Sequence, residues 1–153
     1  MSYLAKIKEL GYELPVVPTP VAAYVPAVRT GNLIMTSGAL PIKNGELLYK
    51  GKLDGVAITE EMGYEAAKLC ILNGLSIIND AVGLDNVEQI VKITGFVASA
   101  EGFTNQPKVV NGASELLVAI FGKNGEHARS AVGVAELPLN ASVEIEMIVQ
   151  VKE

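Results

Sequence analysis

Arg129 is the residue best suited to binding a small anion. It lies in the run ARSAVGVA, part of an alternating segment that predicts a strand. Because side chains alternate between the two faces of a strand, Arg129 shares its face with Ala131, Gly133 and Ala135. Its planar guanidinium can donate two parallel hydrogen bonds to one carboxylate. We therefore expect an anion pocket, with a ligand or another subunit filling the hollow above these small residues.

Two glutamates near the C-terminus are the candidate general bases. Glu144 and Glu146 share one face of a predicted last strand, and the apolar side chains between them take the other face. A carboxylate at a water-filled cleft can orient a water molecule and accept its proton. Three interpretations stay open from spacing alone: either glutamate is solvated, holds such a water, or forms a salt bridge with Arg129.

The single histidine and the single cysteine carry less chemistry. His127 has no Cys, His or acidic cluster at metal-ligand spacing around it, so we expect no metal site and interpret it as a polar residue at a loop end beside Arg129. Cys70 lies in an apolar periodic segment, where a buried and unreactive thiol is the usual outcome. The sequence has no phosphate-binding glycine loop, nucleophile elbow, cysteine pair or HExxH helix, and we expect no cofactor.

Charge and composition exclude several partners. The net charge is −5 with no Lys/Arg cluster, which argues against nucleic acid. Half of the residues are apolar and 19% are charged, so part of the apolar surplus is expected in a subunit interface. No apolar stretch reaches the roughly 18 to 20 residues of a membrane span, and the N-terminus lacks a signal-peptide core. We expect a cytoplasmic protein without a membrane partner.

The N-terminal segment is predicted to stand apart from the main domain. Residues 2–10 favour a helix ended by Gly11, with its apolar residues on one side: Leu4, Ile7 and Leu10. Prolines at 15, 18 and 20 favour an extended linker after it. We therefore divide the chain into a helix and linker over 1–17 and one domain over 18–153.

The main domain is predicted to combine strands and two long helices. Strands are expected as a pair within 22–38, at 87–99, and in two alternating runs joined at 137–140 as a long hairpin or near-hairpin. Helices are expected to begin at Thr59 and Asn105 and to end near Gly83 and Gly122. This order predicts an α+β fold, a mixed sheet with both long helices on one face.

Three motifs resemble the YjgF/RidA family, which is also described as endoribonuclease L-PSP-like. They are AAYVPAVRTGNLIMTSG near the start, VKITGFVAS in the middle and ARSAVGVAELPLNASVEIE near the end, spanning about residues 18–153. The resemblance implies a chorismate mutase-like fold and a homotrimer whose three sheets form a central β-barrel, with a ligand cleft at each subunit boundary. The N-terminal extension is typical of a divergent subgroup.

The resemblance also implies roles for individual residues. The family's carboxylate-binding arginine falls on Arg129 and its water-holding glutamate on Glu144, which are the implied catalytic residues. The implied substrate-binding positions, of which the asparagine is one residue out of register, are Tyr24, Ser37, Gly38, Asn111 and Ala131. Family members with this arginine typically hydrolyse 2-imino or enamine acids to 2-oxo acids and ammonia. The implied activity is therefore that of a 2-iminobutanoate/2-iminopropanoate deaminase, a hydrolase, and the implied partner is a small carboxylate-bearing molecule.

Three positions depart from the family pattern. The family often has proline where His127 stands, cysteine where Ala131 stands, and a polar residue where Ala39 stands. Ala131 enlarges the pocket and removes a thiol. The alternative hypothesis is therefore a non-catalytic carboxylate-binding or regulatory trimer of the same fold. A ribonuclease, an activity sometimes attributed to relatives, conflicts with the negative charge and the lack of basic and aromatic patches.

Overall fold

A computed structural model describes residues 1–17, 19 and 22–153. The helices are α1 (Tyr3–Glu9), α2 (Glu60–Val82) and α3 (Gln106–Phe121). The strands are β1 (Ala27–Thr30), β2 (Leu33–Thr36), β3 (Ile42–Lys43), β4 (Glu46–Leu47), β5 (Val87–Ala98), β6 (Ala128–Val134) and β7 (Val143–Val151). Short 3-10 helices follow α2, α3 and β6: η1 (Leu84–Asn86), η2 (Gly122–Gly125) and η3 (Pro138–Asn140).

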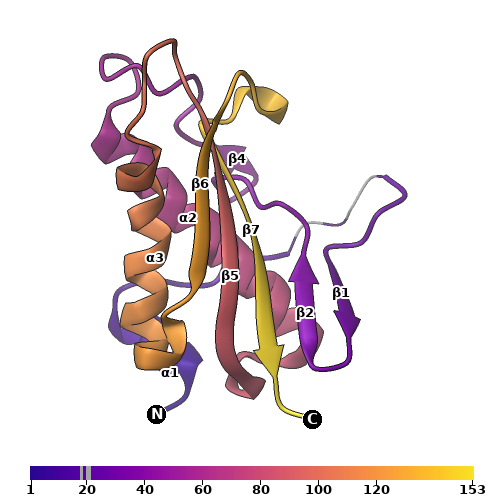
Figure 1. Ribbon diagram of the computed structural model, residues 1–153. Coiled ribbons are helices and arrows are strands. Elements are labelled where there is room, and N and C mark those ends of the chain that lie inside the picture. Colours follow the sequence, from indigo (N-terminus) through magenta and orange to yellow (C-terminus); the bar gives the residue numbers. More distant parts are fainter. Residues whose placement is uncertain (18, 20–21) are drawn as a thin grey trace.

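Five of the strands form one mixed sheet in the order β1-β2-β7-β5-β6, in which β5 and β6 are parallel and the other neighbours antiparallel (Figure 1). The predicted hairpin between the last two strands is wrong, because β5 lies between β6 and β7. Neighbouring strands lie about 5 Å apart, and the connection over 135–142 is long enough to step across one strand. Turns at Gly31 and Asn44 join β1 to β2 and β3 to β4.

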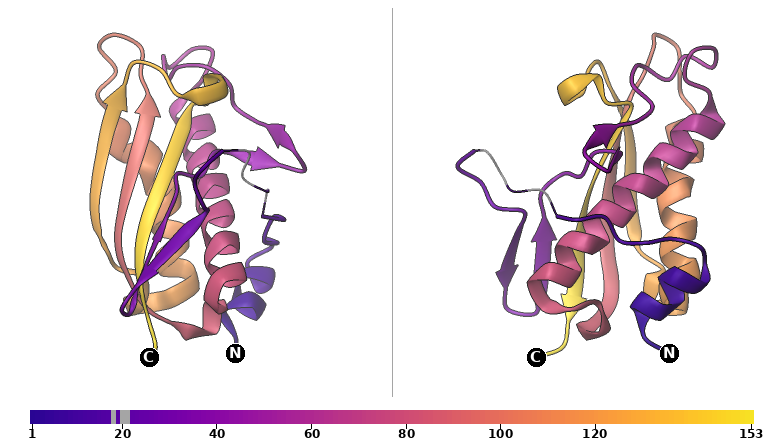
Figure 2. Two further views of the ribbon diagram at one scale, coloured as in Figure 1. Left: turned by 90° about the vertical axis from the view of Figure 1, so that its right-hand side faces the viewer. Right: turned by 180° about the vertical axis from the view of Figure 1, so that it is seen from behind.

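Both long helices cover one face of the sheet, as predicted (Figure 2). The Thr59 hydroxyl accepts a hydrogen bond from the backbone N–H of Met62 at 3.2 Å and so begins α2, which ends at Gly83 with a φ of 79°. Pro107 lies in the first turn of α3. The apolar face of α3 is buried in full: Val109, Ala113, Leu116, Leu117 and Ile120.

The N-terminal helix α1 packs differently from the prediction. Only Ile7 of its predicted apolar side is buried, whereas Leu4 is 44% exposed and Leu10 36% exposed. Tyr3 lies one turn before Ile7, and its ring contacts that of Phe121 on α3, with 4.5 Å between centroids. A helix of seven residues is too short to pack more than a few side chains against the domain. In α1 these side chains are Tyr3 and Ile7, which lie one above the other on the same side. Of the predicted linker, Pro18 and Pro20 lie outside the described residues.

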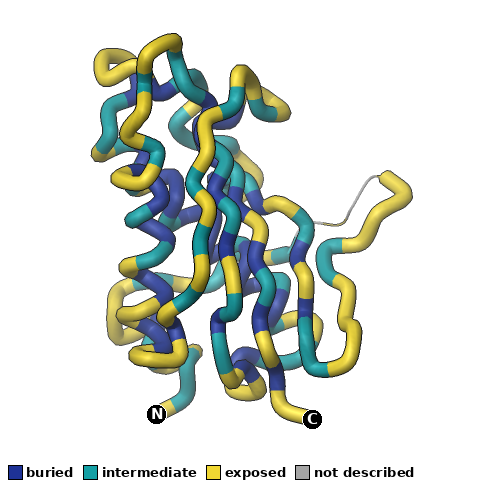
Figure 3. The backbone as a smooth tube through the Cα atoms, in the orientation of Figure 1, coloured by how far each residue is buried: buried dark blue, intermediate teal, exposed yellow. Residues whose placement is uncertain are grey.

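Among the residues that the structure describes, no helix covers the second face of the sheet, and many residues along its strands are exposed (Figures 2 and 3). Val28, Met35 and Val132 are 41% to 56% exposed, and Val28 is paired with Met35 across β1 and β2. Glu144, Glu146 and Ile148 lie on this open face too, since they alternate with buried residues of β7. Within the described residues, no helix has both the length and the apolar character needed to cross a membrane.

Glycine allows α2 and α3 to pack closely. A Cβ at Gly112 on α3 would lie 2.1 Å from the backbone carbonyl oxygen of Tyr64 on α2. A backbone atom cannot turn aside as a side chain can, so any larger residue forces the helices apart. Gly95 on β5 has a similar function toward α3, because a Cβ there would lie 2.5 Å from Val110.

Replacing Gly112 with alanine is expected to lower the free energy of unfolding by about 1 to 3 kcal/mol, because the added methyl group separates two packed helices. Chemical denaturation followed by circular dichroism measures the change. Gly74→Ala is the matched control, because the nearest atom there is the flexible Met147 sulfur at 3.0 Å. There, alanine's better helix propensity, about 1 kcal/mol, offsets the contact. Equal stability of the two variants would contradict the expected effect of close helix packing.

Candidate functional site

Arg129 is held from one side by α3. Its Nη1 donates to Asn111 Oδ1 at 2.8 Å and to Ser114 Oγ at 3.2 Å. Asn111 and Ser114 are three residues apart on α3, so both project toward β6 from the same side of the helix. Within the described part of the chain, Nε and Nη2 of Arg129 have no hydrogen-bond partner. The guanidinium is thus oriented by one nitrogen and keeps donors for an anion.

The small residues beside Arg129 accommodate the helix layer. They share its face as predicted, but the expected open hollow above all of them is wrong: a Cβ at Gly133 would lie 2.6 Å from the side-chain nitrogen of Gln106 on α3. Ala131 is partly buried and packs against the hydrophobic core. Small side chains are needed here because α3 lies close to β6. Among the described strands, β6 is the last strand on its side of the sheet, so Arg129 lies at an edge of the sheet.

Glu144 lies on the opposite face of the sheet from Arg129. Glu144 is paired with Phe96, which is paired with Val132 of β6, so these three side chains share the open face. Arg129 is paired with Ile93, which is buried on the helix face. A salt bridge from Arg129 to Glu144 or Glu146 within one chain is therefore wrong, because the sheet itself separates them.

The Glu144 carboxyl lies against the chain after β2. A Cβ at Gly38 would lie 2.7 Å from Glu144 Oε1, so a larger residue there would force the Glu144 side chain to move. The neighbouring Ala39 is buried and exchanges two backbone hydrogen bonds with Ile145, at 2.8 and 3.0 Å, which holds this segment onto β7. Partial burial, followed by the negative charge of Glu146, raises the pKa of Glu144. This glutamate consequently retains its proton to higher pH than an exposed one.

Tyr24 lies before β1, and Ser37 follows β2 and precedes Gly38, which the Glu144 carboxyl approaches. The Ser37 hydroxyl donates to the Val25 carbonyl at 2.7 Å and so fixes the segment that carries Tyr24. Tyr24 is 57% exposed. The predicted site residues thus form two groups: Tyr24, Ser37 and Gly38 with Glu144, and Asn111 and Ala131 with Arg129.

Sequence analysis missed Ser114, which contacts both Arg129 and His127. The His127 Nε2 is 2.9 Å from Ser114 Oγ, and its Nδ1 is 2.6 Å from the Gly125 carbonyl oxygen. Ser114 follows Asn111 by one helical turn, and that spacing is the signal that was available. Over the ranges that the structure describes, no group of three or more His, Cys, Asp or Glu residues is placed to hold a metal ion.

Cys70 is fully buried, and burial raises the pKa of its thiol well above the usual value. Its sulfur lies 3.6 Å from the Val143 carbonyl oxygen in the core. Since the thiolate is the reactive form of cysteine, the predicted structural role of this residue agrees with its surroundings.

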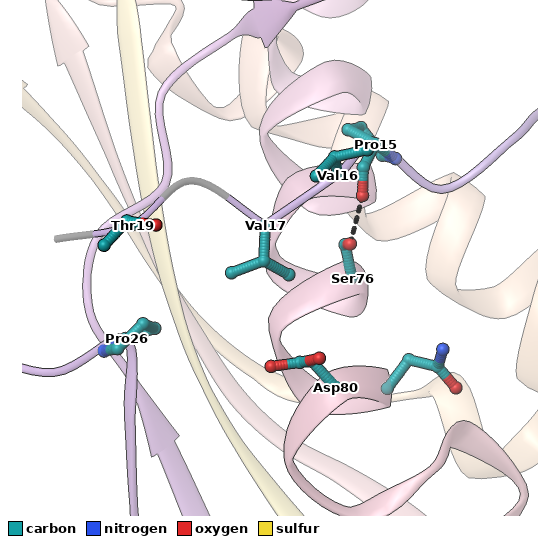
Figure 4. Close-up of a pocket in the computed structure, with 8 residues that line it drawn as sticks. Pro15, Val16, Val17, Thr19, Pro26, Ser76 and Asp80 are labelled. Carbon is teal, nitrogen blue, oxygen red and sulfur yellow. Dashed lines mark hydrogen bonds between the residues drawn. The ribbon is translucent and has the colours of Figure 1, made fainter.

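A separate hollow of about 460 Å³ lies between the N-terminal segment and α2 (Figure 4). Val16, Pro26 and Asp80 are among the residues that line it, and Ser76 donates a hydrogen bond to the Pro15 carbonyl beside it. Pro26 precedes β1, whereas Arg129 lies on β6 at the other edge of the sheet. This hollow therefore lies away from Arg129 and the residues that hold it.

The chain matches a family model described as "YjgF/chorismate mutase-like, putative endoribonuclease" over residues 5–151. It is 40% identical over 148 residues to Protein TCP17 of Trypanosoma cruzi, covering 95% of this chain and 92% of that protein. It is 33% identical over 135 residues to the 2-iminobutanoate/2-iminopropanoate deaminase of Escherichia coli K12, covering 86% and 89%. The crystal structure of Atu1372 from Agrobacterium tumefaciens, a protein of unknown function, matches with a TM-score of 0.92 at 41% identity, covering 98% and 92%.

The chain belongs to the YjgF/RidA family, in a divergent subgroup with TCP17 and Atu1372. The resemblance inferred from the three sequence motifs is thereby confirmed, as is the α+β fold with its mixed five-stranded sheet. The family assignment includes α1 from residue 5 onward.

Replacing Glu146 with glutamine is expected to lower the pKa of Glu144 toward its ordinary value, because one of the two causes of its elevation is removed. Because the pKa of Glu144 is raised, its carboxylate form is lost as pH falls through this raised value. Any reaction that needs this carboxylate as a base should therefore persist to lower pH in the variant. Carbon-13 NMR titration of the glutamate carboxyl groups measures the pKa directly.

Glu9→Gln on α1, behind the sheet, is the matched control and should leave the Glu144 titration unchanged. A Glu144 pKa that stays the same or rises in Glu146→Gln would contradict the electrostatic coupling of the two glutamates.

Proposed function

We propose that this protein hydrolyses 2-imino or enamine acids to 2-oxo acids and ammonia, with Arg129 binding the substrate carboxylate and Glu144 activating water. The observation that carries the proposal is the Arg129 guanidinium, oriented by Asn111 and Ser114 through Nη1 alone. Its Nε and Nη2 can then donate the parallel pair of hydrogen bonds that a carboxylate accepts. The deaminase activity of the Escherichia coli relative supports the same chemistry.

The site is proposed to form between subunits of a homotrimer with a central β-barrel. Arg129 and Glu144 lie on opposite faces of one sheet, so one molecule of substrate cannot reach both in a single chain. A second copy can bring its Glu144 face to the β6 edge of the first. The exposed apolar side chains of Val28, Met35 and Val132 support burial of the open face in such an assembly.

In the proposed mechanism, Arg129 neutralises the carboxylate and fixes the C=N carbon near a water molecule held by Glu144. Glu144 accepts a proton as the water oxygen bonds to that carbon, and the proton then passes to the nitrogen. The remaining hydroxyl proton also passes to the nitrogen through Glu144 as the C–N bond breaks. Ammonia then leaves and the C=O bond of the 2-oxo acid forms, so that imine and water are converted to 2-oxo acid and ammonia. Positioning and base assistance are sufficient for a substrate that already reacts with water.

The other predicted residues take supporting roles in the proposed cleft. Gly38 leaves room for the Glu144 carboxyl, and Ser37 fixes the segment with the exposed Tyr24, whose hydroxyl can face a ligand. Asn111 orients Arg129. Ala131 lies beside Arg129, and its small side chain leaves space for a ligand in the proposed cleft.

A non-catalytic carboxylate-binding or regulatory trimer is the second candidate. Ala131, where the family often has cysteine, favours it, and the more similar relatives TCP17 and Atu1372 carry no named activity. Calorimetry with a 2-oxo acid separates the candidates, because binding without turnover of the imine supports this second function.

Replacing Arg129 with alanine is expected to reduce kcat/KM for imine hydrolysis by about a hundredfold or more, since two charge-assisted hydrogen bonds to the substrate are lost. The measurement is release of 2-oxo acid from 2-imino acids generated enzymatically in the assay. Arg29→Ala is the matched control, because Arg29 lies on β1, where its Nε donates to the Gly31 carbonyl. No acceleration by the wild-type protein, or an unchanged rate in Arg129→Ala, would reject the proposed activity.

A further inference from the structure

His127 is bound at both ring nitrogens, and its partners determine its tautomer. Its Nδ1 lies 2.6 Å from the Gly125 carbonyl oxygen, which can only accept a hydrogen bond, so Nδ1 carries a hydrogen. In the neutral ring, Nε2 is then the acceptor, and it lies 2.9 Å from the Ser114 hydroxyl. The Gly125 carbonyl is well placed to select this tautomer. A Cβ at Gly125 would lie 2.3 Å from the Leu117 carbonyl oxygen, so η2 is packed tightly onto α3.

This tautomer fixes the direction of the next hydrogen bond. With Nε2 as acceptor, the Ser114 hydroxyl donates its hydrogen to His127. Its lone pairs are then available to Arg129 Nη1 at 3.2 Å, and Asn111 Oδ1 accepts from the same nitrogen at 2.8 Å. In this series Arg129 donates to Ser114, Ser114 donates to His127, and His127 donates to the Gly125 carbonyl. A hydrogen-bonded series of this kind holds its members in one arrangement.

We propose that His127 is a positioning residue for carboxylate recognition: its neutral Nδ1–H tautomer holds the Ser114 hydroxyl as an acceptor for Arg129 and so fixes the plane of the guanidinium. The proposal rests on the proposed function in one respect, that Arg129 binds the substrate carboxylate. His127 itself touches neither the substrate nor the reacting atoms.

Loss of the Nε2 acceptor changes what Ser114 can do. A helical serine readily donates its hydrogen to a backbone carbonyl of the preceding turn, and here the Asn111 carboxamide oxygen offers a second acceptor. In the first case the hydroxyl turns away from His127, and in the second it competes with Arg129 for Asn111. Both outcomes loosen the guanidinium plane. Two parallel hydrogen bonds to a carboxylate depend on that plane, so substrate affinity is the property that changes.

The effect is expected on binding because the substrate carboxylate does not change during the reaction. Arg129 binds it equally in the ground state and in the transition state, so a looser guanidinium weakens both alike. A change at His127 therefore raises KM and the dissociation constant of a 2-oxo acid and leaves kcat close to the wild-type value. A general loss of folding would lower kcat as well.

The experiment compares His127→Phe, His127→Gln and Ser114→Ala with the wild-type protein. Phenylalanine keeps a flat ring without an acceptor, whereas the glutamine side-chain oxygen can occupy the Nε2 position and accept from Ser114. Calorimetry with a 2-oxo acid gives the dissociation constant, and imine hydrolysis gives KM and kcat. Ser76→Ala is the matched control for hydroxyl removal. Ser76 lies on α2, away from Arg129, and its hydroxyl donates to the Pro15 carbonyl.

We expect His127→Phe and Ser114→Ala each to weaken binding by about threefold to tenfold, the loss of one hydrogen bond, with kcat unchanged. His127→Gln should recover most of this affinity. In the double variant, His127→Phe should add little to Ser114→Ala, since both act through one hydroxyl. Wild-type affinity in His127→Phe, or full additivity in the double variant, would overturn the proposal.

Nitrogen-15 NMR of labelled histidine tests the tautomer without any ligand. His127 is the only histidine of the chain, so its two ring nitrogens give signals that need no assignment to a residue. A protonated Nδ1 with an unprotonated Nε2 supports the proposal, and a hydrogen on Nε2 at neutral pH overturns it. Binding of 2-oxo acid without imine turnover would reject the proposed function but leave this proposal standing. Imine turnover by the wild-type protein, together with wild-type affinity in His127→Phe, would leave the proposed function standing and overturn this proposal. Absence of 2-oxo acid binding by the wild-type protein would reject both.

Discussion

The separation of Arg129 and Glu144 by the thickness of one sheet is the constraint on which the functional account depends. It follows from strand alternation together with the position of β5, which pairs with both β6 and β7 and thereby fixes which face each residue takes. Within one chain, the cation is turned toward the helices and the carboxyl toward the open face. A reaction that uses both must therefore take place where two chains meet.

The helix layer gives Arg129 its orientation, and small residues allow that layer to come close. Gly112 brings α3 against the backbone of α2, and Gly133 admits Gln106 against β6. At this distance Asn111 and Ser114 reach the guanidinium, and Ser114 also reaches His127. Core packing and recognition are thus coupled, because a change that moves α3 moves the side chains that hold the arginine.

Much of the fold was predictable from local signals, whereas the relation between the functional residues was not. Thr59, Gly83 and Asn105 marked helix boundaries, and alternation correctly grouped Arg129 with small residues and Glu144 with Glu146. Alternation relates residues only within one strand. Whether Arg129 and Glu144 share a face depends on β5 lying between their strands, and the expected hairpin of β6 with β7 concealed this. Similarly, the small residues indicated close approach by something, but whether a ligand or α3 occupied the space depended on tertiary packing.

The most direct measurement is complementation between two inactive variants. Arg129→Ala and Glu144→Gln are each expected to lack imine hydrolysis when purified alone. If the variants are mixed, unfolded and refolded together, some interfaces pair an intact Arg129 from one chain with an intact Glu144 from another. The account predicts activity of up to about a quarter of the wild-type level in the mixture, the share of intact sites expected from random assembly. A mixture as inactive as its components, although mixed oligomers have formed, would contradict a site shared between chains.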